Sequence, residues 1–98
     1  MTNQFEIFDE RFNSILLPNS KLEKLASGAV WSEGPVFLEA DLSVIWSDIP
    51  GNRLMRWSAA DGMSEFLKPS HFQNGHTFDL QSRIIACSHG ERAVVRLE

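Results

Sequence analysis

A repeat of about 40 residues is the feature that most narrows what this chain can fold into. Residues 33–37 (EGPVF) align with residues 74–78 (NGHTF) at an offset of 41, with Gly and Phe matched. Residues 44–45 (VI) align with residues 84–85 (II) at an offset of 40, so the second repeat lacks one residue near the loop equivalent to 39–41. A period of roughly 40–45 residues built of four strands is typical of one blade of a β-propeller.

Turn residues divide the repeat into short runs of strand-forming residues. Residues 43–48 (SVIWSD) are rich in residues that favour strands, with Val44, Ile45 and Trp46 in a row. Asp61-Gly62 is a dipeptide typical of hairpins, and residues 49–52 (IPGN) have the composition of a turn. We predict an antiparallel meander with strands over residues 33–38, 43–48, 52–57, 63–67, 75–79, 83–88 and 92–97.

The expected fold class is therefore all-β, with about two four-stranded antiparallel blades from the N-terminal portion of a β-propeller. Blade one is expected over about residues 30–68, and an incomplete blade two over about residues 72–98. A propeller closes with ~4–8 blades, and the last residues follow directly on the third strand of the second repeat. We expect the sequence to be a piece of a longer chain, whose open strand edges favour self-association.

Residues 1–26 have a different pattern and are expected to form a helix and a leading strand ahead of the partial propeller at 27–98. Over residues 4–17, apolar side chains recur at spacings of three and four, which predicts a short amphipathic α-helix with one core-facing stripe. Pro18 ends this helix, because proline cannot continue one. Residues 21–26 (KLEKLA) are predicted to form the leading strand.

The charge and the cysteine content exclude several classes of function. The net charge is −4, and the nine Lys and Arg residues are scattered, whereas nucleic-acid-binding domains usually carry a basic patch. No apolar run approaches the ~20 residues of a membrane-spanning helix, and the N-terminus does not resemble a secretory signal. Because Cys87 is the only cysteine, no internal disulfide can form. We expect a cytoplasmic protein without nucleic-acid or membrane partners.

Polar side chains at the starts of the predicted inner strands are candidates for a functional site. Glu33 precedes Gly34-Pro35, and in a propeller such a carboxylate points to the axis, where a hard cation finds oxygen ligands. The alternative is a surface carboxylate in a turn. Asn74 has the equivalent position in the second repeat and lines the same pocket, unless it is only a turn residue before Gly75.

Two histidines that follow Asn74 in the second repeat are further candidates for the pocket. His76 shares a strand face with Asn74, and His89 follows the next predicted strand. Either side chain can donate a hydrogen bond to a substrate or act as a general base near neutral pH. The alternative for each is a structural histidine. His71 is interpreted as a loop residue, and no catalytic residue is assigned.

Other conspicuous residues are given structural roles. Asp48 ends a predicted strand and is expected to accept backbone N–H groups of the following turn. Trp31, Trp46 and Trp57 are expected to pack between neighbouring blades.

Several segments occur in an order that is specific as a set: WSEGPVF at 31–37, IWSDIP at 45–50, RLMRW at 53–57, PS at 69–70, NGHTFD at 74–79 and CSHG at 87–90. Together they resemble the start of a gluconolactonase of the regucalcin/gluconolactonase/luciferin-regenerating family. The resemblance covers about residues 27–98.

The resemblance implies a six-bladed propeller that holds a divalent metal ion (Ca²⁺, Zn²⁺ or Mg²⁺) and hydrolyses the ring ester of sugar lactones. It implies that Glu33 is the first metal ligand, and that an Asn and an Asp from later blades complete the site. Asn74, His76 and His89 are then expected to contact the lactone, and the isolated chain is expected to be inactive. The alternative is a non-catalytic propeller that serves as an interaction or calcium-binding module, because a fold does not determine a function.

Overall fold

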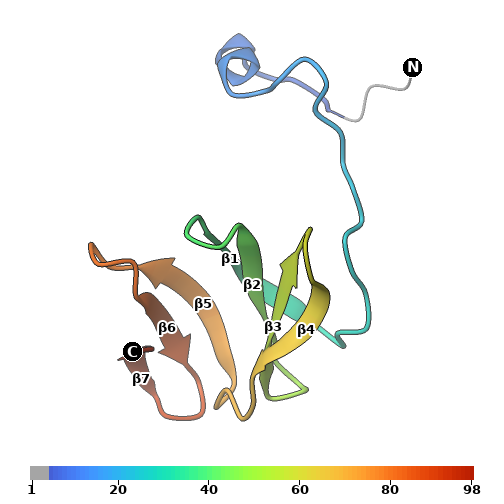
Figure 1. Cartoon of the computed structure of the whole chain (residues 1–98). Helices are drawn as coiled ribbons and strands as arrows, with labels where there is room; N and C mark the ends of the chain where they lie inside the picture. Colours follow the sequence, from blue (N-terminus) through green and yellow to red (C-terminus); the bar gives the residue numbers. More distant parts are fainter. Residues whose placement is uncertain (1–4) are drawn as a thin grey trace.

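The computed structural model describes residues 5–98 and contains seven strands in two antiparallel sheets (Figure 1). Sheet A has the order β1-β2-β3-β4, and sheet B has the order β5-β6-β7. The all-β prediction is confirmed, and each strand begins and ends within two residues of its predicted bounds. The strands are β1 (Ser32–Leu38), β2 (Ser43–Asp48), β3 (Arg53–Ser58), β4 (Gly62–Leu67), β5 (Gln73–Phe78), β6 (Ile84–Ser88) and β7 (Ala93–Arg96).

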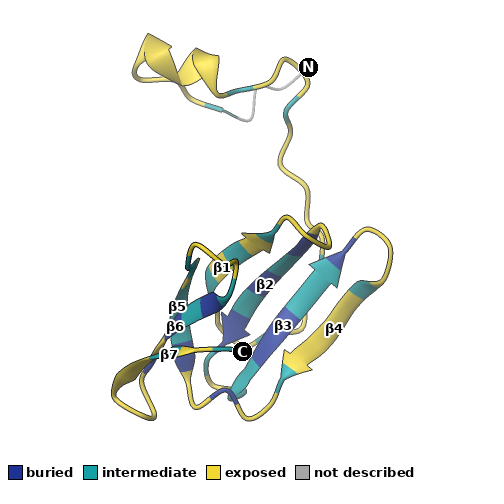
Figure 2. Cartoon of the chain, turned by 60° about the vertical axis from the view of Figure 1, so that its left-hand side comes forward, coloured by how far each residue is buried: buried dark blue, intermediate teal, exposed yellow. Residues whose placement is uncertain are grey.

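The core lies between the two sheets, because each sheet turns an apolar face towards the other. In β2, buried and half-buried residues alternate, as expected for a strand with one face in a core. Ile45 from β2, Leu54 from β3 and Ile84 from β6 form its centre, and the residues packed around them are Val36, Leu38, Leu67, Phe78 and Leu97. Figure 2 shows the buried positions on the central strands, whereas β4 is mostly exposed.

The hydrogen-bond register confirms the repeat and the site of its one-residue difference. The pair Phe37–Val44 in sheet A corresponds to Phe78–Ile84 in sheet B, and the second pair encloses one residue fewer. Each first strand also has a register shift near its start, before Val36 in β1 and before Gly75 in β5. Irregularities of this kind bend a strand and redirect its side chains, so both strands are bent where the candidate residues lie.

The prediction of an α-helix over residues 4–17 is wrong for the described residues, and Gln4 lies outside them. The segment forms only a 3₁₀-helix, η1 (Glu10–Ser14), with Asp9 as its N-cap. Its apolar side chains do not join the core between the sheets, and Phe8 is 89% exposed and Ile15 is 76% exposed. A short helix without such packing is marginal in water. Figure 1 shows this segment away from the sheets.

The leading strand predicted at residues 21–26 is also wrong, because these residues join neither sheet. A strand needs a neighbour to satisfy its backbone hydrogen bonds, and within residues 5–98 no strand pairs with this segment. Separately, we find no helix in the described part of the chain with the length and apolar character to cross a membrane.

Candidate functional site

Sheets A and B come into backbone contact at a place that we call the β1–β5 junction, formed by Glu33, Gly34, Asn74 and His76. A Cβ atom added at Gly34 would lie 1.6 Å from the backbone oxygen of Asn74, so only glycine permits this approach. Gly34 also has a φ of +63°, in the region that favours glycine. The junction places the first strands of both repeats side by side, and Glu33 and Asn74 are each the second residue of their strand.

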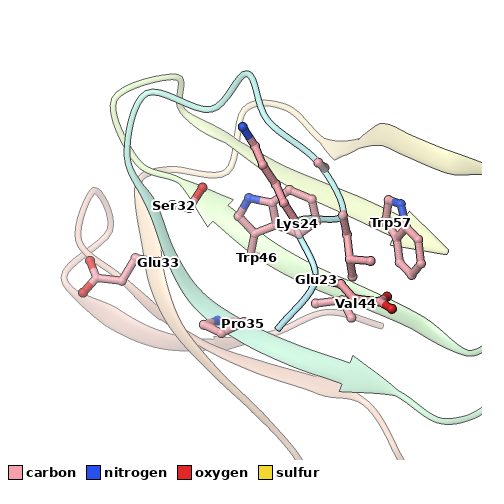
Figure 3. Close-up of a pocket in the computed structure, with 10 residues that line it drawn as sticks. Glu23, Lys24, Ser32, Glu33, Pro35, Val44, Trp46 and Trp57 are labelled. Carbon is pink, nitrogen blue, oxygen red and sulfur yellow. The ribbon is translucent and has the colours of Figure 1, made fainter. Parts of the chain in front are cut away.

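Glu33 presents a free carboxylate at this junction. It lies opposite Ser47 in the β1–β2 ladder, on the face of sheet A that also carries Ile45. Its side chain is exposed, and within residues 5–98 no hydrogen bond or ion pair engages it. Figure 3 shows the carboxylate pointing away from Trp46 and Trp57. An unpaired carboxylate of this kind is a suitable oxygen ligand for a hard cation.

The described residues do not complete a metal site by themselves. No group of three or more His, Cys, Asp or Glu side chains in residues 5–98 is arranged to hold a metal ion. Ca²⁺ takes ~6–8 oxygen ligands, and a structural zinc site takes about four ligands. Among residues 5–98, Glu33 can therefore supply no more than one ligand of such a site.

Both ring nitrogens of His76 lie within hydrogen-bond distance of protein groups at the junction. Its Nδ1 lies 2.7 Å from the carbonyl oxygen of Gly34, which can only accept, so Nδ1 carries a proton and donates it. Its Nε2 lies 3.3 Å from the side-chain oxygen of Gln73. Because Nε2 then carries no proton and can only accept, the amide of Gln73 must be turned so that its N–H group donates to Nε2. Burial lowers the pKa of His76, and the bond to Gly34 offsets part of this effect, so the ring is neutral at pH 7.

Asn74 and His89 lie at the same end of sheet B. Asn74 is the extra residue in the irregular part of β5 and is partly buried. His89 follows β6, its backbone N–H donates to the carbonyl of Phe72 at 3.3 Å, and its side chain is exposed. The structure thus brings Glu33, Asn74 and His76 together and leaves His89 in the neighbouring turn. Their contacts with a lactone stay predictions.

Asp48 holds the chain just before β1, a role that no sequence pattern indicated. It does accept backbone N–H groups, but the donors are Val30 at 3.1 Å and Trp31 at 3.2 Å rather than the following turn. The reason is the pairing of β1 with β2, which brings the segment before β1 to the end of β2. The Asp48 side chain is 1% exposed and also accepts from Arg53 Nε at 3.1 Å. Burial alone would raise the pKa of Asp48, but the bonds from Trp31, Arg53 and Val30 hold it below its ordinary value.

A groove of about 390 Å³ lies on the face of sheet A that is turned away from sheet B (Figure 3). Trp46 and Trp57 line it, and residues 23–26 form its other wall. Because neighbouring residues of a strand point to opposite faces, Trp46 cannot share the core face of Ile45. Trp31 is 64% exposed. The prediction that the tryptophans pack between blades therefore does not hold for sheets A and B.

A family model described as the SMP-30/gluconolactonase/LRE-like region matches residues 31–98, which include both sheets and the whole β1–β5 junction. The chain belongs to this family. The resemblance noted in the ordered segments of the sequence is thereby confirmed. The matched residues include all four candidate site residues, Glu33, Asn74, His76 and His89.

Several proteins that are similar to this chain carry the name gluconolactonase. The gluconolactonase of Zymomonas mobilis is 31% identical over 104 residues, which cover 93% of this chain and 29% of the relative. An X-ray structure of a candidate gluconolactonase matches with a TM-score of 0.79 and 40% identity, over 89% of this chain and 30% of that one. A gluconolactonase of Xanthomonas campestris matches with a TM-score of 0.68 and 38% identity, over 71% of this chain and 24% of that one. The chain spans less than a third of the length of these relatives.

Proposed function

We propose that these residues form the N-terminal part of a sugar-lactone hydrolase that resembles gluconolactonases and opens the ring ester of aldonolactones. The observation that carries the proposal is the β1–β5 junction. At this junction the chain presents the free carboxylate of Glu33 on β1 beside Asn74 and His76 on β5. The backbones of the two strands are in contact there. A relative named gluconolactonase aligns with 93% of the chain in sequence.

The fold proposed for the longer protein is a six-bladed propeller in which sheets A and B are consecutive blades. Two observations support further blades. Trp46 and Trp57 line an open groove on the outer face of sheet A, and the Zymomonas relative is more than three times as long as this chain. We assign the outer face of sheet A to another sheet of the same polypeptide. In the isolated chain, this face and the open strand edges favour self-association.

Glu33 is proposed to supply one oxygen ligand to a divalent cation (Ca²⁺, Zn²⁺ or Mg²⁺), with the remaining ligands from later blades. When bound, such a cation polarises an ester carbonyl and lowers the pKa of a bound water. The side chains of Asn74 and His89 are proposed to orient the lactone by hydrogen bonds to its hydroxyl groups. A cytoplasmic location is proposed because Cys87 is the only cysteine in the sequence.

The 98-residue chain by itself is expected to show no appreciable lactonase activity. One carboxylate and one amide cannot hold a divalent cation against water, because a hard cation needs about six oxygen ligands in fixed geometry. The measurement is hydrolysis of an aldonolactone followed with a pH indicator, corrected for spontaneous ring opening, with and without added divalent metal. Metal-dependent turnover by this chain alone would contradict the proposal that later blades complete the site.

In the longer protein, Glu33→Gln is expected to weaken metal binding by about a hundredfold or more and to remove most lactone hydrolysis. Glutamine keeps the size of the side chain but removes its charge, and even groups that only orient metal ligands contribute ~10–100-fold to affinity. Metal affinity is measured by calorimetric titration and hydrolysis by the pH-indicator assay.

The matched control for this substitution is Glu39→Gln, which neutralises another exposed carboxylate at the far end of β1. It is expected to leave both quantities unchanged. Unaltered metal binding and hydrolysis in Glu33→Gln would remove Glu33 from the metal site. A longer protein that binds Ca²⁺ but hydrolyses no lactone would instead favour the non-catalytic module.

A further inference from the structure

The imidazole of His76 holds the backbone immediately after Glu33. Its Nδ1 donates to the carbonyl oxygen of Gly34 at 2.7 Å, from sheet B across to sheet A. Gly34 and Pro35 lie in the irregular part of β1, where the register of the β1–β2 ladder is interrupted. The orientation of the Gly34–Pro35 peptide therefore depends on a side chain from the other sheet.

The backbone before Glu33 is held as well, from within sheet A. Two residues earlier, the N–H of Trp31 donates to the buried carboxylate of Asp48 at 3.2 Å. The Glu33 side chain makes no hydrogen bond or ion pair of its own within residues 5–98. The direction in which the Glu33 side chain leaves the strand is consequently set by the backbone between these two points, and of the two hydrogen bonds only the one from His76 comes from sheet B.

We propose that His76 is a positioning residue: by its bond to Gly34 it sets the direction in which β1 presents the Glu33 carboxylate. Both ring nitrogens face protein groups, Gly34 on one side and Gln73 on the other, so neither is directed at a substrate. This differs from the substrate contact predicted from the sequence. The consequence for hydrolysis rests on the proposed function, whereas the effect on the β1 backbone does not.

The bond is tested first in the unmodified 98-residue chain by long-range ¹H–¹⁵N correlation spectra of its histidines. His76 is expected as the neutral tautomer protonated on Nδ1, because the Gly34 carbonyl can only accept. Free neutral histidine prefers the Nε2-protonated form, so the result is diagnostic. A ring protonated on Nε2 alone would overturn the proposal without any variant being made.

The positioning is tested next by two substitutions with opposite expectations. His76→Asn keeps an N–H donor near the place of Nδ1, whereas His76→Leu removes the donor at similar size. His76→Leu is expected to shift the backbone ¹³C signals of Glu33, Gly34 and Pro35, and His76→Asn is expected to restore them. The control is His71→Asn, at an exposed loop residue whose φ of +57° asparagine tolerates.

In the longer protein, His76→Leu is expected to lower kcat for lactone hydrolysis by roughly tenfold to a hundredfold, since a small displacement of a catalytic group has effects of this size. His76→Asn is expected to retain most of kcat, and KM is expected to change little. In a Glu33→Gln background the same His76→Leu substitution is expected to cause no further loss, because there is no carboxylate left to direct.

Rescue by asparagine, together with the disappearance of the effect in the Glu33→Gln background, supports a positioning role. Equal damage by Asn and Leu, or losses that add in the double variant, would show a merely structural histidine. If His76→Leu does not fold, the tautomer and the spectrum of His76→Asn still decide the question. If the longer protein hydrolyses no lactone, the proposed function fails, while the ¹³C shifts of the 98-residue chain still support or overturn the role of His76.

Discussion

Replacing Gly34 with alanine is expected to destabilise the chain by about 3 kcal/mol or more and to separate sheet B from sheet A at the β1–β5 junction. The added methyl carbon would lie 1.6 Å from the backbone oxygen of Asn74, and a backbone atom cannot turn aside as a flexible side chain can. The φ of +63° adds the cost of a left-handed alanine, ~1–2 kcal/mol. The free energy of unfolding in urea measures the loss.

Gly62→Ala is the matched control, because Gly62 has a similar φ of +70° but nothing within 4 Å of the added carbon. It is expected to lose only the backbone contribution, about 1–2 kcal/mol. The difference between the two variants isolates the contact between β1 and β5. Equal losses at the two positions would mean that the strands do not approach as closely as described.

Asp48→Ala is expected to cost about 3–5 kcal/mol, which is what breaking a buried ion pair by removing one partner typically costs. The substitution leaves the N–H groups of Val30 and Trp31 and the guanidinium of Arg53 without their shared acceptor. A small domain has ~5–15 kcal/mol of stability in total, so the variant is expected to be largely unfolded or to melt far below the parent chain. Circular dichroism during thermal unfolding measures this.

The same carboxylate predicts how stability depends on pH. Because hydrogen bonds hold the folded-state pKa of Asp48 below its unfolded value near 3.8, its contribution is present above that pH and is lost as the pH falls through the folded-state pKa. Asp48→Asn is therefore expected to flatten the acid side of the stability curve. Asp61→Asn, at an exposed carboxylate of the β3–β4 turn, is the control. If the stability of Asp48→Asn still falls steeply at low pH, the acid dependence comes from other carboxylates.

Gly34→Ala and Asp48→Ala both act close to the candidate site, on either side of Glu33. Asp48 fixes the chain two residues before it, and Gly34 with His76 fixes the chain directly after it. Loss of either restraint is therefore expected to reduce metal binding in the longer protein as well as stability. The residues that stabilise this part of the fold are therefore also those that hold the backbone on both sides of Glu33.

The strands could be predicted from the sequence because their signals are local. The strand-forming residues at 43–48 and the turn residues at 49–52 and 61–62 are local features of the chain, and the repeat offset followed from the same patterns. The helix at 4–17 failed for the opposite reason. Its apolar stripe is a true pattern, but in this structure the stripe does not pack into the core between the sheets. An amphipathic helix gains most of its stability from such packing.

The sequence by itself determined the strands, their antiparallel order, the family and the candidates Glu33 and Asn74 at the starts of the first strands. Only the tertiary structure decided what these residues touch: that Gly34 lies against Asn74, that His76 donates to Gly34, and that Asp48 binds the segment before β1 rather than its own turn. The physical reason is sequence distance. Backbone periodicity is set by neighbouring residues, whereas a contact across 42 residues depends on how two twisted and bent strands pack, which no local pattern specifies.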